Sequence, residues 1–251
     1  MQFSINKQPL NETEENQLKE ALLTLSRFKG MPQFEWIEEI ITRLDSGLGL
    51  SKNNQQIIEF EKNDFLKGLE HITTFYNAIL YKKVIEVRYK SFKQENCQSI
   101  IFHPYYIKQF KNRWFVFGLN EEFGQLTNLA LDRIISLIEN KKAYIPNTAI
   151  DFVEYFEDVI GVTVDKEANL EKVKLKINKD LYPYIQTKPI HGSQKIKEKT
   201  ETYVLIELEV IPNYELESLL LSFGEGITVL SPQTIQERIK NRLHLTLNNY
   251  D

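Results

Sequence analysis

The sequence predicts an α+β protein with a helical N-terminal region, a small β-barrel in the middle and an α/β part at the C-terminal end. Three successive hydrophobic patterns predict this order. Apolar residues recur three and four positions apart over residues 11–45, which is typical of amphipathic helices. They alternate with polar residues from 84 to 138, which is typical of strands, and a mixed pattern begins near residue 170.

The N-terminal region is predicted to hold two helices, because Gly30 can end one helix and Pro32 can open the next. A helical hairpin this short cannot bury its wide apolar stripes alone. We therefore expect residues 1–82 to act as a helical linker and dimerisation region, and the chain to form a two-fold homodimer. A short strand within residues 52–60 and a further helix over residues 65–82 complete this part.

The middle of the chain is predicted to consist of short antiparallel strands. The expected strands cover residues 84–89, 99–106 with a continuation to 110, 113–119 and 126–135. A polar loop, a tight turn at Lys111 and Asn112, and a turn over 120–124 separate them. Pro104 cannot donate a ladder hydrogen bond, so it indicates an edge or a bulge. Strands at this spacing favour a small barrel.

The C-terminal part follows a connector that contains a short helix at 151–160. Strands are expected at 173–178, 191–199, 203–211 and 227–230, with helices at 179–186, interrupted by Pro183, at 214–223, capped by Asn213, and from Ser231 to Leu247. The first six of these elements run β-α-β-β-α-β, which is the order of ferredoxin-like domains.

Composition and motifs argue against several classes of function. The net charge is −4, so the chain lacks the overall basic field of a non-specific nucleic-acid binder. A single cysteine, Cys97, fits a reducing compartment, and the sequence has neither a signal core nor an apolar run of membrane length, so we expect a cytoplasmic protein without a membrane partner. We find no catalytic, phosphate-loop or metal-ligand motif, and expect a protein that is not an enzyme and needs no metal or cofactor.

Four motifs, in order, resemble a WYL domain over residues 81–138. They are the strand Ile85–Tyr89, the segment His103–Tyr106, the triplet Trp114–Val116 in place of Trp-Tyr-Leu, and the closing Leu131–Ile134. The chain is thereby identified as resembling the effector-binding part of bacterial WYL-domain transcriptional regulators, without their winged helix-turn-helix. That resemblance implies that promoter DNA is contacted only through a winged helix absent from this chain, which is either a piece of a longer regulator or a headless paralogue.

The resemblance also implies the fold and the boundaries of each part. The WYL domain of these regulators is a Sm-like five-stranded β-barrel, expected here at residues 83–140. Residues 141–169 are then a connector, and residues 170–251 match the ferredoxin-like C-terminal extension of the family in element order.

By resemblance, the WYL pocket binds a nucleic-acid or nucleotide-like effector, such as single-stranded nucleic acid. The implied ligand-binding residues are Tyr89, Ser91, His103, Arg113, Trp114 and Arg133. Arginine suits phosphate because its planar fork of donors stays charged and binds two oxygens at once. Purely structural roles remain open for three of these residues: an ion pair with Asp132 or Glu86 for Arg133, a surface or satisfied core position for His103, and packing for Trp114.

Two further features of the sequence bear on the size of the effector and on where anions can bind. Thr127 and Ala130 occupy positions where many relatives carry arginine, which favours a smaller or less charged effector. The lysines at 188, 195, 197 and 199 fit either a solvated edge strand or an auxiliary phosphate-binding surface. The sequence thus predicts a ligand-sensing and oligomerisation module, and its alternative is a protein-interaction scaffold with a vestigial pocket.

Overall fold

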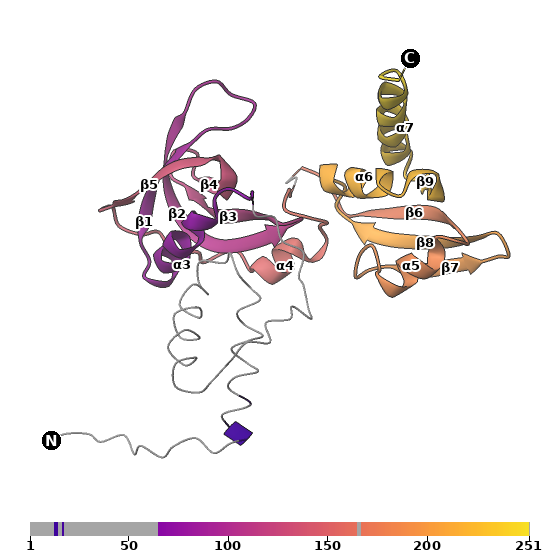
Figure 1. The fold of residues 1–251 in the computed structure, drawn as a ribbon, viewed down its shortest axis with the longest axis horizontal. Helices are drawn as coiled ribbons and strands as arrows, with labels where there is room; N and C mark the ends of the chain where they lie inside the picture. The colour runs from indigo at the N-terminus through magenta and orange to yellow at the C-terminus, as the bar shows by residue number, and fades with distance from the viewer. Residues whose placement is uncertain (1–12, 15–16, 18–64, 165–166, 251) are drawn as a thin grey trace, which may run out of the picture. The chain divides into compact units, whose positions relative to one another are not determined.

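The structure is a computed structural model that describes residues 13–14, 17, 65–164 and 167–250. The strand predicted at 52–60, and the helices predicted at 11–45 apart from three positions, lie outside the described residues. The chain divides into two compact units, residues 1–146 and residues 147–251. Each unit contains its own antiparallel sheet, so the chain is an α+β protein with two sheets (Figure 1).

The first unit is built on a five-stranded antiparallel sheet with the order β4-β3-β2-β1-β5. Its strands are β1 (Val84–Tyr89), β2 (Gln98–Phe110), β3 (Arg113–Asn120), β4 (Gln125–Ala130) and β5 (Ile134–Asn140). Helix α3 (Ile72–Leu80) packs against β2, and the ring of Phe75 meets that of Phe102 edge-on at 6.4 Å. Buried residues of α3, β1 and β2 make up most of one apolar core.

Several predicted details of this unit are confirmed. Strand β1 has the predicted bounds, and β2 runs through to Phe110. Lys111 and Asn112 form the tight turn with φ of 47° and 59°, the left-handed values that a two-residue hairpin turn requires. The β2–β3 register shifts between Pro104 and Tyr106, where the proline predicted a bulge.

Three predictions for the first unit are corrected. The helix expected over 65–82 is shorter, because Gly68 adopts φ of 87° and packs on the backbone of Leu131, and a short 3₁₀ turn, η3 (Leu69–His71), precedes α3. The strand expected at 126–135 is two strands, joined by the 3₁₀ turn η4 (Leu131–Arg133), because the chain must leave β3 and reach β1. Among the described residues no ladder joins β4 to β5, so the strands form an open sheet and not a closed barrel.

The second unit has a four-stranded antiparallel sheet with the order β7-β8-β6-β9. Its elements are α4 (Phe152–Glu157), β6 (Glu171–Asn178), α5 (Tyr182–Thr187), β7 (Lys195–Lys199), β8 (Tyr203–Val210), α6 (Tyr214–Leu221), the 3₁₀ turn η5 (Gly224–Gly226), β9 (Ile227–Ser231) and α7 (Gln233–Leu247). The predicted β-α-β-β-α-β order from β6 to β9 is therefore present.

Local signals explain the bounds in the second unit. The Asn213 side chain accepts a hydrogen bond of 2.8 Å from the backbone N–H of Leu216, which confirms it as the cap of α6. Pro183 does not interrupt α5 but lies in its first turn, where a missing N–H costs nothing. Strand β7 begins later than predicted because His191 and Gln194 close a turn through a backbone hydrogen bond of 3.1 Å.

Candidate functional site

Two arginines meet one carboxylate at the end of β3 and in η4. Arg113 is the first residue of β3, directly after the 111–112 turn, and its Nε lies 3.1 Å from Asp132 Oδ2. Arg133 follows Asp132 in η4, with its Nε 4.0 Å from Asp132 Oδ1. The Asp132 side chain is only 10% exposed, whereas those of Arg113 and Arg133 are 45% and 28% exposed. We call these three residues the arginine cluster, and it has a net charge of +1.

The contact between Arg133 and Asp132 is loose. Arg133 Nε and Asp132 Oδ1 are both buried atoms, and neither has a hydrogen-bond partner among the described residues. An unsatisfied guanidinium N–H is costly in such a position, because it has lost water without gaining a partner. The ion pair that the sequence offered as the alternative role for Arg133 is therefore present only at the limit of contact distance. Glu86, the other suggested partner, instead accepts a hydrogen bond of 2.7 Å from the Ser99 hydroxyl.

An aromatic ring faces the guanidinium of Arg133. Arg133 Cζ lies 4.7 Å from the centroid of the Phe92 ring, and the Phe92 side chain is 71% exposed. Phe92 belongs to the loop between β1 and β2, which is tied to η4 by a hydrogen bond of 3.0 Å from Lys90 N to Arg133 O. Ser91 lies in the same loop, where its hydroxyl oxygen accepts from Lys93 N at 3.3 Å. Sequence analysis missed Phe92, because the composition of this polar loop gave no sign of what the ring would contact.

Tyr89 and Trp114 support this region from the core. Tyr89 is 9% exposed and belongs to the apolar core, and its hydroxyl oxygen accepts a hydrogen bond of 3.4 Å from Ala130 N. Trp114 is partly buried and packs against the same core. The structure thus brings Arg113 and Arg133 together at Asp132, and places Ser91 in the loop that is tied to Arg133. It uses Tyr89 mainly to hold the start of η4 against β1.

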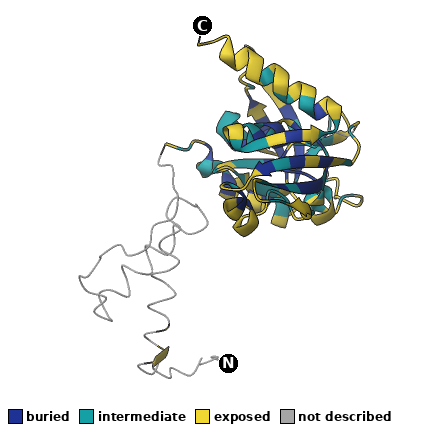
Figure 2. Ribbon diagram, turned by 90° about the vertical axis from the view of Figure 1, so that its right-hand side faces the viewer, coloured by how far each residue is buried: buried dark blue, intermediate teal, exposed yellow. Residues whose placement is uncertain are grey.

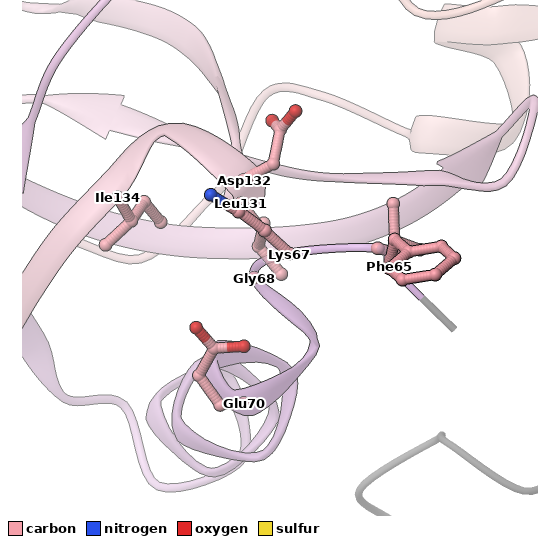
Figure 3. Close-up of a pocket in the computed structure, with 8 residues that line it drawn as sticks. Phe65, Lys67, Gly68, Glu70, Leu131, Asp132 and Ile134 are labelled. Atoms are coloured by element: carbon pink, nitrogen blue, oxygen red, sulfur yellow. The ribbon is translucent and has the colours of Figure 1, made fainter. Parts of the chain in front are cut away.

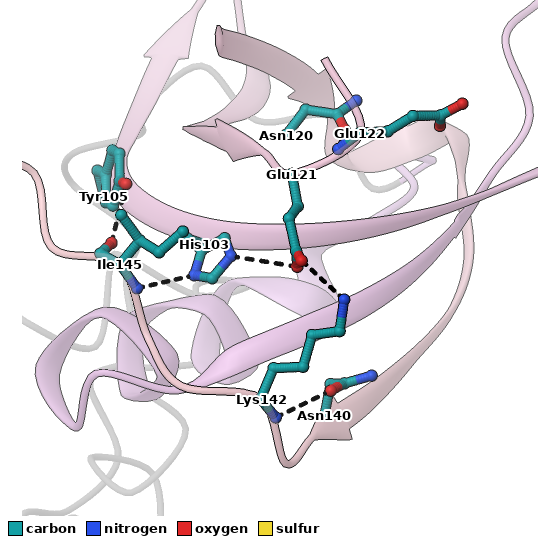
Figure 4. A network of polar contacts seen from close by, with 8 residues as sticks. All are labelled: His103, Tyr105, Asn120, Glu121, Glu122, Asn140, Lys142 and Ile145. Atoms are coloured by element: carbon teal, nitrogen blue, oxygen red, sulfur yellow. Dashed lines mark hydrogen bonds and ion pairs between the residues drawn. The ribbon is translucent and has the colours of Figure 1, made fainter. Parts of the chain in front are cut away.

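His103 lies in a different network at the other end of the β2–β3 ladder (Figure 4). It pairs with Leu119, whereas Arg113 pairs with Phe110. The His103 ring is 1% exposed, and its Nδ1 accepts a hydrogen bond of 3.0 Å from Ile145 N. This bond assigns the proton to Nε2, which points at Glu121 Oε2 from 3.6 Å. His103 therefore lies in the core, but only its Nδ1 is satisfied, because Nε2 is buried and has no hydrogen-bond partner among the described residues.

The surroundings of His103 set its protonation. Burial holds its pKa below the usual value because it disfavours the imidazolium, and Glu121 opposes this only in part. Glu121 also binds Lys142 at 2.7 Å, and the pKa of that carboxyl is lowered first by the lysine. Tyr144 donates to Pro104 O at 2.7 Å, and burial raises its pKa to about 12. Together these contacts fasten residues 142–145 onto β2.

An open pocket of about 500 Å³ adjoins the arginine cluster on the side of residues 65–70 (Figure 3). Its lining consists of Phe65, Leu66, Lys67, Gly68, Glu70, Leu131, Asp132 and Ile134. Gly68 is required here, because a Cβ atom would lie 2.4 Å from the carbonyl carbon of Leu131. The sequence predicted these residues only as the start of a helix, and gave no signal that they border Asp132.

The described residues contain no group of three or more His, Cys, Asp or Glu side chains arranged to hold a metal ion. None of the helices that the structure describes has both the length and the apolar character needed to cross a membrane.

Each of the two units matches the model of a known protein family. Residues 70–138 match the model of the WYL domain, and residues 169–247 match the model of the WCX domain. The two matches together cover more than half of the chain, and the first includes β1 to β4, η4 and most of β5. The fold is thus that of a protein with a WYL domain followed by a WCX domain. The chain belongs to the WYL-domain family, as its four motifs indicated.

Two solved structures show distant similarity. The proteasome accessory factor B/C (PafBC) of Arthrobacter aurescens is 14% identical, with 94% of this chain and 36% of that chain covered and a TM-score of 0.31. A CRISPR Cas-related protein is 15% identical, with 73% of this chain and 51% of that chain covered and a TM-score of 0.45. The chain thus spans about a third and about a half of the lengths of these two. No curated protein matches the sequence significantly.

Proposed function

We propose that this chain is the ligand-sensing and oligomerisation module of a bacterial transcriptional regulator. Its effector is a nucleic-acid- or nucleotide-like anion, bound at the arginine cluster. Its role is binding and not catalysis, in the cytoplasm, and promoter DNA is contacted by a winged helix attached to it or carried by a partner. The effector acts by population shift, because it favours one arrangement of a homodimer over another. The family membership of both units supports this role.

The observation that carries the proposal is the pairing of Arg133 with Phe92. A nucleotide needs a cationic donor for its phosphate and a flat face for its base. Arg133 and Phe92 supply these groups side by side, and Arg113 adds a second, more exposed guanidinium on the same carboxylate. The Arg133 side chain is 28% exposed although its Nε is buried, so a phosphate oxygen would contact the terminal N–H groups of the guanidinium.

The surroundings favour a small effector. Ala130 is buried and donates its backbone N–H to Tyr89, and Thr127 hydrogen-bonds the backbone of Gln125 at 3.4 Å. Neither position adds charge, so the cluster offers two guanidinium groups and one opposing carboxylate. We therefore propose a ligand with one or two phosphates at this site.

Two finer points of fold accompany the proposal. The five-stranded order of the first unit is consistent with a Sm-like topology whose sheet stays open. The β-α-β-β-α-β order and the β7-β8-β6-β9 sheet support a ferredoxin-like second unit.

A ligand screen tests the proposed function. The full chain is heated with nucleoside mono- and diphosphates, cyclic dinucleotides and short oligonucleotides, and the shift in melting temperature is measured. A ligand that binds only the folded state raises it. The Arg113→Gln/Arg133→Gln variant is expected to lose the shift, whereas Lys93→Gln/Lys141→Gln, which removes the same charge at exposed positions, is expected to keep it.

A protein-interaction scaffold with a vestigial pocket is the alternative, and one observation favours it. The end of α7 and the residues that follow it expose four large apolar side chains, each more than half exposed: Leu243, Leu245, Leu247 and Tyr250. Most of the C-terminal helix is coloured as exposed (Figure 2). Exposed apolar surface of this kind marks protein-binding sites. If no anion shifts the melting temperature, and Leu243→Ser/Leu247→Ser abolishes self-association or partner binding, the scaffold role replaces the sensor role.

A further inference from the structure

One face of the four-stranded sheet in the second unit carries a row of lysines. Val173, Leu175 and Ile177 of β6 are each 0% exposed. Successive side chains of a strand point to opposite faces, so Lys172, Lys174 and Lys176 lie on the other face, about 6.6–7 Å apart along the strand. Lys195 and Lys197 of β7 reach the same face, because they pair with glutamates there. We call these five residues the lysine face.

The lysine face is neutralised on one side only. Glu207 and Glu209 of β8 lie opposite Lys174 and Lys172 in the register. On the other side, β9 places the uncharged Ser231 and Thr228 opposite Lys174 and Lys176. The β6 row therefore meets acidic partners toward β8 and uncharged side chains toward β9.

The ion pairs on this face leave most of the lysine ammonium groups free to contact a polyanion. Lys197 holds Glu207 closely, at 2.8 Å. Lys172 and Lys195 approach Glu209 only at 3.9 and 3.8 Å, and their side chains are 67% and 62% exposed. Pairs so long and so exposed contribute little, so a polyanion displaces them at small cost. Lys174 makes no ion pair within 4 Å among the described residues.

Protection of a sheet edge does not explain this row. Lysines on an edge strand prevent pairing with other chains, and this accounts for those on β7, which is an edge. Strand β6 is central, between β8 and β9, so its backbone groups are already paired and need no such protection. Edge protection therefore does not explain why lysines occupy alternate positions of β6.

One aromatic ring borders the row. Tyr203 of β8 lies opposite Asn178, and Lys176 Nζ is 4.9 Å from the centroid of its ring. An aromatic ring beside a line of cations is a combination that binds single strands, because phosphates contact the cations and a base stacks on the ring.

We propose that the lysine face binds single-stranded nucleic acid along β6, between Tyr203 of β8 and the uncharged side chains of β9, without reading its sequence. The chain has a net charge of −4, so this attraction is local to one face and not a property of the whole protein. The surface is separate from the arginine cluster, because it lies in the other unit and shares no residue with it. In addition to the effector site of the first unit, the protein would then have a second and longer surface that binds nucleic acid.

The test is fluorescence anisotropy of labelled (dT)₂₀ with the full chain across a range of salt concentrations. Lys172→Gln/Lys174→Gln/Lys176→Gln is expected to weaken binding at least tenfold. It is also expected to make the slope of log K against log salt shallower by about 2, since each phosphate contact on a single strand contributes about 0.7. The control Lys141→Gln/Lys179→Gln/Lys240→Gln removes the same charge from exposed lysines outside the lysine face, and its affinity is expected to stay within twofold.

Two further variants separate the explanations. Lys172→Arg/Lys174→Arg/Lys176→Arg keeps the charge and is expected to bind (dT)₂₀ normally. In the Arg113→Gln/Arg133→Gln variant the loss caused by the β6 substitutions is expected to persist, which separates this surface from the effector site. The proposal is overturned if the β6 triple variant and the control triple variant lose the same affinity for (dT)₂₀. It is also overturned if the wild-type protein does not bind (dT)₂₀ at low salt, or if it binds vesicles containing phosphatidylserine but no oligonucleotide.

Discussion

The guanidinium of Arg133 lies over the ring of Phe92, with its Cζ atom 4.7 Å from the ring centroid. The two residues are far apart in sequence, and the Lys90–Arg133 backbone hydrogen bond brings their segments together. The pair combines a fixed positive charge with an exposed aromatic face. The first two predictions depend on this arrangement.

Arg133→Ala is expected to cost roughly 1.5–3 kcal/mol of effector affinity, the range for a hydrogen bond to a charged group. The fold should survive, because Arg133 is partly exposed and makes only a loose contact with Asp132. Phe92→Leu keeps the bulk and removes the ring, so it should cost about 0.5–1 kcal/mol. Calorimetric titration with the ligand found in the screen measures both. Unchanged affinity in a folded Arg133→Ala protein would mean that the effector binds elsewhere.

Asp132→Asn is expected to move stability and anion affinity in opposite directions. The substitution leaves the guanidinium groups of Arg113 and Arg133 without their shared counter-charge, which should lower the free energy of unfolding by about 1–2 kcal/mol after allowance for solvent screening. The same loss removes the carboxylate that competes with a phosphate, so the effector should bind more tightly. Urea unfolding and ligand titration on one preparation measure the two quantities. A variant that weakens both would show that Asp132 positions the arginines for binding.

The His103 network predicts loss of stability in mild acid. Burial lowers the pKa of His103 from 6.5, so below that pH the unfolded chain binds more protons than the folded one. The free energy of unfolding should therefore fall as the pH drops from about 6.5 through the lower folded-state pKa. Protonation at Nδ1 would also place a donor against the N–H of Ile145.

The measurement is urea unfolding at several pH values between 7.5 and 5. His103→Gln retains an acceptor for Ile145 N–H but cannot titrate, so its stability should vary less with pH in this window. His244→Gln, at an exposed position on α7, serves as the matched control and should follow the wild type. If His103→Gln and the wild type show the same slope, the acid sensitivity arises from other groups.

Gly118→Ala is expected to destabilise the first unit. Its Cβ atom would lie 2.3 Å from His103 O and 2.7 Å from the Phe102 ring, where neither the backbone nor a fully buried ring can easily withdraw. Overpacking of this kind costs about 1–3 kcal/mol. Gly192→Ala is the control, because a Cβ atom there would have nothing within 4 Å, and it should change stability by less than about 0.5 kcal/mol. Equal midpoints in thermal unfolding would contradict this account of β2–β3 packing.

The proposed homodimer can be tested by direct measurement of the molecular mass. The apolar stripes in the sequence of residues 11–45 and the exposed apolar end of α7 both favour self-association. Light scattering coupled to gel filtration should therefore give about twice the chain mass of 29.6 kDa. A clean monomer at tens of micromolar would contradict the proposed oligomerisation.

The sequence by itself determined the family and most of the strands. The motifs around Tyr89, Trp114 and Arg133 suffice because they combine rare residue types in a fixed order, and the family comparison confirms them. Alternation with a period of two located β1 and β6 well, since one face of each strand is fully buried. Asn213 and Pro183 marked helix starts because capping is a local interaction, although only the first was interpreted correctly.

Only the tertiary structure decided what each polar side chain does. His103 and Arg133 were both ligand candidates in the sequence, yet one lies buried against Ile145 N–H and the other lies partly exposed over Phe92. The break of the predicted strand at η4 likewise depends on β5 crossing to β1, which no local pattern encodes. Hydrophobic periodicity reports which face of a segment is buried. The partner of a charged group is set by segments far away in the chain, and these meet only when the sheet has formed.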